Sequence, residues 1–401
     1  MADRETMPVW PLMAMLGVQT LATMAVFALP AAAPEVVRDL GVDRGLIGLF
    51  VSMIYGVSIV SAVFSPGFVH RYGAVRVSQV VLVATAAMLA ITATGTLLSL
   101  ALGALAIGFG YGATAPSATH LLVPQTPKRV FNFVMSIRQI GVPLGGVLGA
   151  LIVPPLTLAH GWRYAMAVQV VPVLILAGLL ELPRRRWDAG RNPRHRIFGP
   201  DLFGPITLLR QSEKIKRLSV ASFIYSGIQL CFIAFMTVHL TSDAGFDLLG
   251  AGRALAAYQV AGAVSRPIWG WVADRYFAPA RVLALHGLVM AAASLATGFF
   301  APAWPTAAIL LTCVIAGATA SGFTGLAFAE YARLGGARRT EATGLGAAAM
   351  FSGVMLLPLS MGATLTATGS PMLCYATLAV LAVMAAWVIG ARPTAMPAVA
   401  P

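Results

Sequence analysis

The sequence contains few charged residues, few cysteines and little lysine. Charged residues make up 10% of the 401 residues, whereas about a quarter of residues are charged in soluble globular proteins. Hydrophobic residues make up 58%, which also excludes a disordered chain. Cys231, Cys313 and Cys374 lie inside apolar runs, which favours buried small side chains over a disulfide or metal site. We therefore expect a membrane protein that holds no metal or other cofactor.

Long apolar runs separated by short charged or Gly/Pro-rich breaks recur along the whole chain. Each run is close to the roughly 20 apolar residues that a membrane-spanning helix needs. These runs predict an all-α polytopic membrane protein with twelve transmembrane helices. The helices are expected at residues 9–32, 45–66, 77–97, 99–121, 132–155, 164–182, 219–240, 250–272, 282–300, 305–328, 342–364 and 371–391.

The positions of the basic residues predict an orientation. With both termini cytoplasmic, 21 of the 27 Lys and Arg residues lie in cytoplasmic segments. Only four lie in external loops, and they are Arg38, Arg44, Arg163 and Arg253. This asymmetry is the positive-inside signature of a multi-pass membrane protein, so the net charge of +13 gives no support to nucleic-acid binding. Abundant Ala, Gly and Arg beside only three lysines suggest a bacterial plasma (inner) membrane protein.

A basic segment divides the twelve helices into two sets of six. Residues 183–218 contain Arg184, Arg185 and Arg186 together with prolines and glycines, and they are too polar to span a membrane. We expect an N-terminal six-helix half at 1–182, a basic cytoplasmic linker at 183–218, a C-terminal half at 219–391 and a cytoplasmic tail at 392–401. The linker is either a solvated segment near anionic lipid headgroups or a regulatory region.

The two halves carry matching motifs after their second helix. His70-Arg71-Tyr72 follows the helix at 45–66, and Asp274-Arg275-Tyr276 follows the helix at 250–272. A duplicated six-helix unit is typical of transporters that rock two halves around a central site.

These motifs resemble the loop signature of the major facilitator superfamily, Gly-x-x-x-Asp-Arg/Lys-x-Gly followed by basic residues. Gly270, Asp274 and Arg275 match it in the second half. The first half keeps three positions and has a histidine at the acidic one, and these residues are Arg71, Gly73, Arg76 and His70. The resemblance covers essentially the whole chain. It implies two pseudo-symmetric six-helix halves and a transporter that is not an enzyme.

The resemblance also implies a gating role for these motif residues. In the family the motif aspartate lies against the positive N-terminus of a helix from the other half, where a carboxylate is favourable. Asp274 can make this contact, whereas His70 cannot do so as an anion and would be repelled if protonated. We therefore expect an asymmetric lock that is stronger at Asp274. On this reasoning, His70→Asp should favour the outward-open state.

Arg138 and Arg266 are expected inside the membrane. Each lies about six residues from the cytoplasmic end of its helix, which is roughly 10 Å at 1.5 Å per residue. In the fold that the resemblance implies, these two helices face each other, and neither helix body contains an acid. An anion between the arginines would relieve their repulsion, and a planar guanidinium suits a carboxylate. The alternative for each arginine is that it extends to the membrane surface.

Arg266 carries a second resemblance. Arg266, Pro267 and Gly270 match the Arg-Pro-x-x-Gly segment of the monocarboxylate-transporter branch, in which the arginine is implicated in holding the substrate carboxylate. That branch has an aspartate four residues earlier, where this chain has Gly262. The usual partner for proton coupling is therefore missing at this position.

The predicted helix at 132–155 contains two glycines that suggest close packing. Gly145 and Gly149 are four residues apart, a spacing that allows two helix backbones to approach closely.

Further polar residues of the predicted helices are candidate ligands. Some share a helical face with the arginines or lie on helices expected to line the cavity. Each is equally consistent with an ordinary hydrogen bond between helices. They are Gln139, Gln259, Tyr258, Tyr225, Gln229, Tyr55, Tyr111 and Gln19.

The sequence thus favours a monomeric secondary transporter of a small organic anion, acting by alternating access in the lipid bilayer. One alternative is an exporter of drugs, siderophores or other amphiphiles, which the many aromatic and methionine residues would suit. Another is a sensor or membrane enzyme that keeps the fold, although no cluster of catalytic residues supports it.

Overall fold

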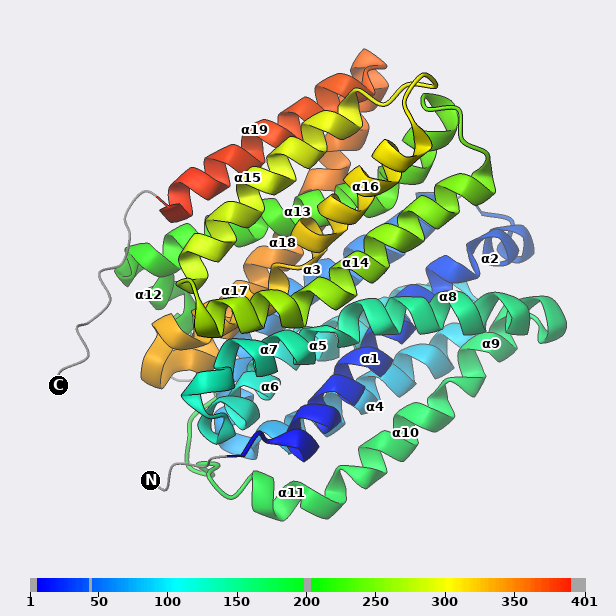
Figure 1. Ribbon diagram of the computed structural model, residues 1–401. Helices are drawn as coiled ribbons and strands as arrows, with labels where there is room; N and C mark the ends of the chain where they lie inside the picture. Colours follow the sequence, from blue (N-terminus) through cyan, green and yellow to red (C-terminus); the bar gives the residue numbers. More distant parts are fainter. Residues whose placement is uncertain (1–5, 43–44, 198–202, 391–401) are drawn as a thin grey trace.

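The computed structural model describes residues 6–42, 45–197 and 203–390, and it is a bundle of α-helices (Figure 1). The first half contains α1 Val9–Ala31, α2 Ala33–Leu40, α3 Gly45–Tyr72, α4 Ala74–Ala93, α5 Leu97–Tyr111, α6 Thr114–Leu122, α7 Phe131–Gln139, α8 Gly141–His160, α9 Trp162–Val168 and α10 Val170–Leu179. The linker region contains α11 Glu181–Trp187 and α12 Gly204–Gln211, and its helices extend past the expected bounds of 183–218, since α11 begins at Glu181 and α13 begins already at Glu213. The second half contains α13 Glu213–Ser242, α14 Leu248–Arg275, α15 Pro279–Gly298, α16 Thr306–Ala316, α17 Thr324–Gly335, α18 Arg339–Thr368 and α19 Pro371–Gly390.

This architecture confirms the predicted all-α membrane fold. Each of the twelve predicted segments coincides with one helix or with a pair of helices separated by a short break, such as α7 and α8. Among the described residues, ten helical stretches are long and apolar enough to cross a membrane. One of them, Thr306–Thr368, covers two predicted segments. The ten stretches thus cover eleven of the predicted segments, and α14, which matches the segment at 250–272, is a continuous helix of 28 residues that is not among them. The expected count of twelve therefore fits this arrangement. The predicted tail at 392–401 lies outside the described residues.

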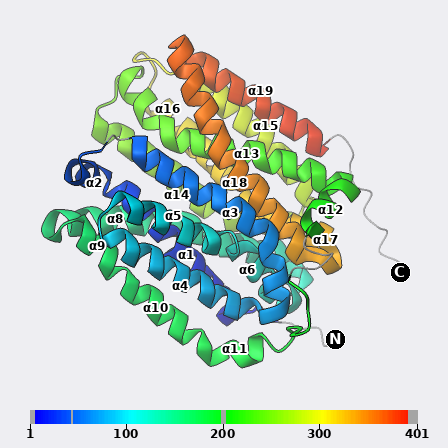
Figure 2. The same cartoon turned by 180° about the vertical axis from the view of Figure 1, so that it is seen from behind.

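The two halves meet most closely at one end of the bundle. We call this the linker end, because α11 and α12 lie there, where α1 begins and α19 ends (Figure 1). At this end α7 packs against α14 and α17, while α18 packs against α3 and α6. Toward the opposite end α14 diverges from α8 (Figure 1), and α18 diverges from α3 (Figure 2). The backbones of the two halves are therefore closest to each other at the linker end.

Within the first half, α8 packs tightly against α1 at Gly145. A Cβ atom at this position would lie 2.4 Å from the carbonyl oxygen of Thr20, which belongs to the α1 backbone. At Gly149 the nearest atom, the Met24 carbonyl oxygen, is 3.5 Å away, which is an ordinary contact. The close approach that the sequence suggested for both glycines therefore depends on Gly145 alone.

Gly145→Ala is expected to destabilise the protein by about 1–3 kcal/mol, because the new methyl group must displace a backbone rather than a flexible side chain. Thermal unfolding of the purified protein should show a lower Tm. Gly149→Ala is the matched control on the same helix and should leave the Tm nearly unchanged. Equal Tm values for the two variants would contradict this account.

Candidate functional site

A cavity of about 120 Å³ lies between the halves, and both halves contribute to its wall. The polar part of the wall includes Arg138 from α7 and Arg266 from α14. Both arginine side chains are nearly inaccessible, with residue exposures of 2% and 1%. They therefore do not extend to the membrane surface, which was the alternative left open by the sequence.

Arg138 is held by two glutamine side chains. Its Nη2 donates to Oε1 of Gln19 at 2.8 Å, and its Nη1 donates to Oε1 of Gln139. Its Nε is buried, and no hydrogen-bond partner is found for it among the described residues. Gln19 is itself fixed by Thr23, to which its Nε2 donates at 3.0 Å. Arg138 thus keeps a buried donor that a bound molecule could use.

Arg266 donates mainly to backbone carbonyls. Its Nε donates to the Ser321 carbonyl at 3.0 Å, and Nη2 donates to Oγ of Ser321 at 3.2 Å. Its Nη1 donates to the carbonyl of Gln139 in the other half. Arg266 therefore connects the two halves directly across the cavity.

Breaks in two helices make these carbonyls available. Pro143 lies four residues after Gln139 and has no N–H with which to close the helical hydrogen bond to that carbonyl. The predicted helix at 132–155 is thus divided into α7, which ends at Gln139, and α8, which begins at Gly141. Ser321 ends a five-residue π-helix, Gly317–Ser321, labelled η4, where the changed bonding register frees backbone groups. Irregular backbone of this kind is tolerated in a membrane where it lines a cavity.

The charge of the cavity wall is uncompensated. The described residues that line the cavity include two arginines and no Asp or Glu. The partners of both guanidinium groups are neutral amides, hydroxyls and carbonyls. Glu330 of α17 is buried, but Arg333 occupies its carboxylate at 2.7 Å. Buried charges are normally paired, so this wall favours an anionic ligand.

Three aromatic rings form the other part of the wall. The ring centroids of Tyr55 and Tyr111 are each 5.6 Å from that of Phe351, and they are 6.4 Å from each other. Tyr111 also reaches the arginine region, because its hydroxyl accepts from Nε2 of Gln19 at 3.3 Å. The cavity therefore combines a cationic region with an aromatic region.

Most of the predicted ligands line this cavity, but two do not. The residues on the wall are Arg138, Arg266, Gln139, Gln259, Gln229, Tyr55, Tyr111 and Gln19. Tyr225 instead donates to the Leu283 carbonyl at 3.0 Å, and Tyr258 donates to the Gln229 carbonyl at 3.3 Å. Helical spacing predicted that both side chains face the cavity. Each hydroxyl instead donates to a backbone carbonyl of a neighbouring helix.

Sequence reasoning missed several wall residues, including Phe351 and Ser321. The predicted helix at 342–364, which corresponds to α18, had no candidate ligand that would have drawn attention to Phe351. The π-helix that presents Ser321 to Arg266 has no reliable sequence signature, although it begins at Gly317 and is followed by Gly322.

Asp274 makes the contact that the family resemblance implied. Its carboxylate accepts from the backbone N–H groups of Asn132 and Phe133 at 3.0 and 2.9 Å, and from Nδ2 of Asn132 at 2.8 Å. Asn132 and Phe133 lie in the first turn of α7 in the other half, so the carboxylate caps the positive end of that helix. Gly270 allows the close approach, since a Cβ there would lie 2.7 Å from the Asn132 carbonyl oxygen.

The equivalent contact in the first half is different. His70 faces the start of α18, where its Nε2 lies 3.3 Å from Oε1 of Glu341. The helix itself therefore supplies the carboxylate, and a protonated His70 would be attracted there rather than repelled. The expectation for His70→Asp also reverses, because two carboxylates would then face each other and loosen this contact.

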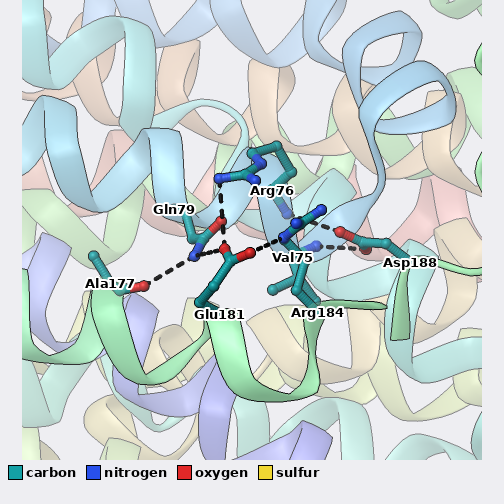
Figure 3. Close-up of polar contacts among 7 residues, drawn as sticks. All are labelled: Val75, Arg76, Gln79, Ala177, Glu181, Arg184 and Asp188. Carbon is teal, nitrogen blue, oxygen red and sulfur yellow. Dashed lines mark hydrogen bonds and ion pairs between the residues drawn. The ribbon is translucent and has the colours of Figure 1, made fainter. Parts of the chain in front are cut away.

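The remaining motif residues of the first half bind the linker to that half. Asp188 accepts from the N–H groups of Val75 and Arg76 at 2.9 and 3.0 Å, which caps α4 (Figure 3). Arg76 also lies 3.6 Å from Glu181 of α11. Gly73 precedes this helix with φ of 94°, and a Cβ there would collide with Asp188. Burial raises the pKa of the Asp188 carboxyl, while the two N–H donors act in the opposite direction.

Arg71 and Arg275 complete the motif set. Nη1 of Arg71 donates to the His195 carbonyl of the linker at 3.4 Å. Arg275 is exposed at the end of α14.

Two six-helix halves around a charged central cavity are the architecture of membrane transporters that bind their substrate between two such halves. A family model named Major Facilitator Superfamily matches residues 15–334 and 218–401. The chain belongs to this superfamily, as the sequence motifs implied.

Curated relatives and solved structures are similar to the chain. It is 27% identical over 288 residues to the 4-hydroxybenzoate transporter PcaK of Pseudomonas aeruginosa, covering 64% of each chain. It is 25% identical over 282 residues to a gallate transporter of Pseudomonas putida, covering 63% of this chain and 62% of that one. The human organic anion transporter MFSD10 shares its fold, with a TM-score of 0.75, 16% identity and coverage of 96% and 100%.

The chain thus spans a little under two thirds of the length of the curated relatives. These relatives are transporters by name and not enzymes, in agreement with the sequence expectation.

Asp274→Asn is expected to weaken closure at the linker end, because the capping carboxylate loses its charge. The readout is the rate at which Ser136→Cys, buried in α7 beside Gly270, reacts with an impermeant maleimide. The rate should rise several-fold, since such a contact is worth about 0.3–1 kcal/mol or more when partly buried. Asp243→Asn removes a carboxylate outside this contact and should not change the rate. An unchanged rate in Asp274→Asn would exclude the capping role.

Proposed function

We propose that the protein is a secondary transporter of small organic anions, with monocyclic aromatic carboxylates as its substrate class. The observation that carries this proposal is the pair of buried arginines, one from each half, beside a group of aromatic rings in a single cavity. The carboxylate would lie between Arg138 and Arg266, and the ring would lie toward Tyr55, Tyr111 and Phe351. Aromatic pairs favour ring centroids 4.5–7 Å apart, so a substrate ring would suit this wall.

The size of the cavity supports a small ligand. Its volume of about 120 Å³ is close to the ~150 Å³ of an engineered cavity that binds benzene. Sites for drug-sized ligands are usually about 300–1,000 Å³. A single ring with a carboxylate therefore suits the cavity better than the drugs or siderophores of the alternative exporter hypothesis.

The names of the relatives support the same class, because they are transporters of 4-hydroxybenzoate and gallate. Another relative, the probable nitrate/nitrite transporter NarK2 of Mycobacterium tuberculosis, is 30% identical over 173 residues, covering 42% of each chain. Its named substrates are also anions. Anion recognition is thus the property common to these relatives, and the aromatic wall favours the organic members.

The transport cycle would be alternating access between the two halves. Arg266 donates to the Gln139 carbonyl across the cavity, and an entering carboxylate would compete with that carbonyl for the guanidinium group. Substrate binding would therefore also weaken this contact between the halves. We further propose a monomer in a bacterial plasma membrane, with both termini on the cytoplasmic side and the linker end facing the cytoplasm.

Arg138→Gln and Arg266→Gln are each expected to lower the affinity for 4-hydroxybenzoate at least tenfold, because a charge-assisted hydrogen bond is worth about 1.5–3 kcal/mol. Ligand-induced thermal stabilisation of the purified protein measures this, with nitrate and a cationic drug as competing classes. Arg253→Gln is the control, since Arg253 is an exposed arginine of α14, the helix that also contains Arg266. Equal stabilisation of wild type and both variants by 4-hydroxybenzoate would refute the anion site.

Gln139→Glu tests the same site without removing an arginine. The new carboxylate would lie within hydrogen-bond reach of Arg138 and would replace the substrate as its partner. We expect the variant to lose 4-hydroxybenzoate binding while its Tm in the absence of ligand stays equal or rises. Gln259→Glu, on the same cavity wall, controls for simple repulsion by an added charge and should weaken binding less. Undiminished binding in Gln139→Glu would contradict a carboxylate position at Arg138.

A further inference from the structure

Three of the six histidines of the sequence meet at the linker end, although they are far apart in the chain. His70 lies in the last turn of α3, His120 lies in α6 and His195 lies in the linker. The ring centroid of His70 is 5.1 Å from that of His120 and 5.3 Å from that of His195. The scattered sequence positions gave no sign of this cluster.

The cluster faces the start of α18 in the other half, where Glu341 supplies a carboxylate. His70 contacts Glu341 as described above, and Nδ1 of His120 lies 3.2 Å from Oγ1 of Thr340. Thr340 and Glu341 belong to the first turn of α18. The second carboxylate oxygen of Glu341 is buried, and no hydrogen-bond partner is found for it among the described residues. The first half thus brings imidazole rings to a carboxylate that still has acceptor capacity.

The linker is part of the same site. The backbone N–H of Asn192 donates to the His70 carbonyl at 2.9 Å. A small hollow at this position is lined by His70, His195, Arg196 and Glu341 among others. The side chains of His70 and Glu341 are 26% and 16% exposed, so protons can reach the contact while water screens it only partly.

We propose that His70 and Glu341 form a proton-binding site between the halves, and that uptake of one proton holds the linker end closed. A neutral His70 makes only a hydrogen bond to Glu341, whereas an imidazolium adds a charge-assisted bond across the interface. The site is separate from the anion cavity, and its action does not depend on the identity of the substrate.

The neighbouring charges limit the site to one proton. The charged and titratable groups near it are Arg71 of α3, His120 of α6, His195 and Arg196 of the linker, and Arg338, Arg339 and Glu341 at the start of α18. Glu341 is the one anion in this set, so a second imidazolium beside the first would meet mainly like charges. The expected response to falling pH is therefore a single closing step.

The test measures the separation of the halves against pH in the full chain, in lipid nanodiscs without any transported anion. Spin labels at Lys128→Cys and Ala337→Cys report the distance across the linker end, because both positions are exposed and lie in opposite halves. The native cysteines are buried and stay unlabelled. Measurements run from about pH 8 to about pH 5.5, on either side of the ordinary imidazole pKa of about 6.5.

In the wild type, the population with the short distance should grow about threefold to fivefold on acidification, the scale of one partly screened charge-assisted bond. His70→Gln and Glu341→Gln should each abolish this growth. His160→Gln changes an exposed histidine outside the cluster and should keep the wild-type response. If either site variant fails to give monodisperse protein, the other one decides.

A wild-type distance that does not depend on pH, or one that lengthens on acidification, would overturn the proposal. The same applies if both site variants keep the wild-type response. Because no substrate is present, these outcomes do not depend on whether the protein transports aromatic carboxylates.

Discussion

Two buried guanidinium groups, one from each half and both lining one cavity, impose the strongest constraint on this molecule. Each group needs acceptors where water is excluded, and the wall offers no described carboxylate. The structure meets this need with backbone carbonyls that helix breaks release, at Gln139 before Pro143 and at Ser321 in the π-helix. The helix breaks and the contact between the halves therefore both provide acceptors for the same two charges, and the proposed anion site would use these charges too.

At the linker end, the two pseudo-symmetric contacts have similar positions but different chemical groups. In one contact the carboxylate of Asp274 crosses from the second half to cap α7. In the other, the carboxylate belongs to α18 itself, and His70 of the first half approaches it. The first contact joins a carboxylate to backbone N–H groups, whereas the second joins an imidazole to a carboxylate. Two contacts of similar placement can thus respond differently to the same conditions.

The fold and the central arginines were predictable because hydrophobic run length and embedded charge are strong local signals. The capping contact of Asp274 was predictable because Gly270, Asp274 and Arg275 match the family motif at the corresponding positions. Side-chain direction was less accessible, as Tyr225 and Tyr258 show, because a tyrosine hydroxyl turns toward any free carbonyl of a neighbouring helix. The histidine cluster and the π-helix depend on tertiary placement and on a shifted backbone register, and neither leaves a periodic pattern in the sequence.

The absence of described acids from the cavity wall has an electrical consequence. With its cavity empty, the protein would carry two positive charges within the membrane, and a bound monoanion would reduce this to one. Moving one elementary charge through the full membrane potential involves about 2.3 kcal/mol per 100 mV. Any movement of these arginines along the membrane normal would therefore couple to voltage, and more strongly for the empty carrier than for the loaded one. The membrane potential would then favour one direction of the return step over the other.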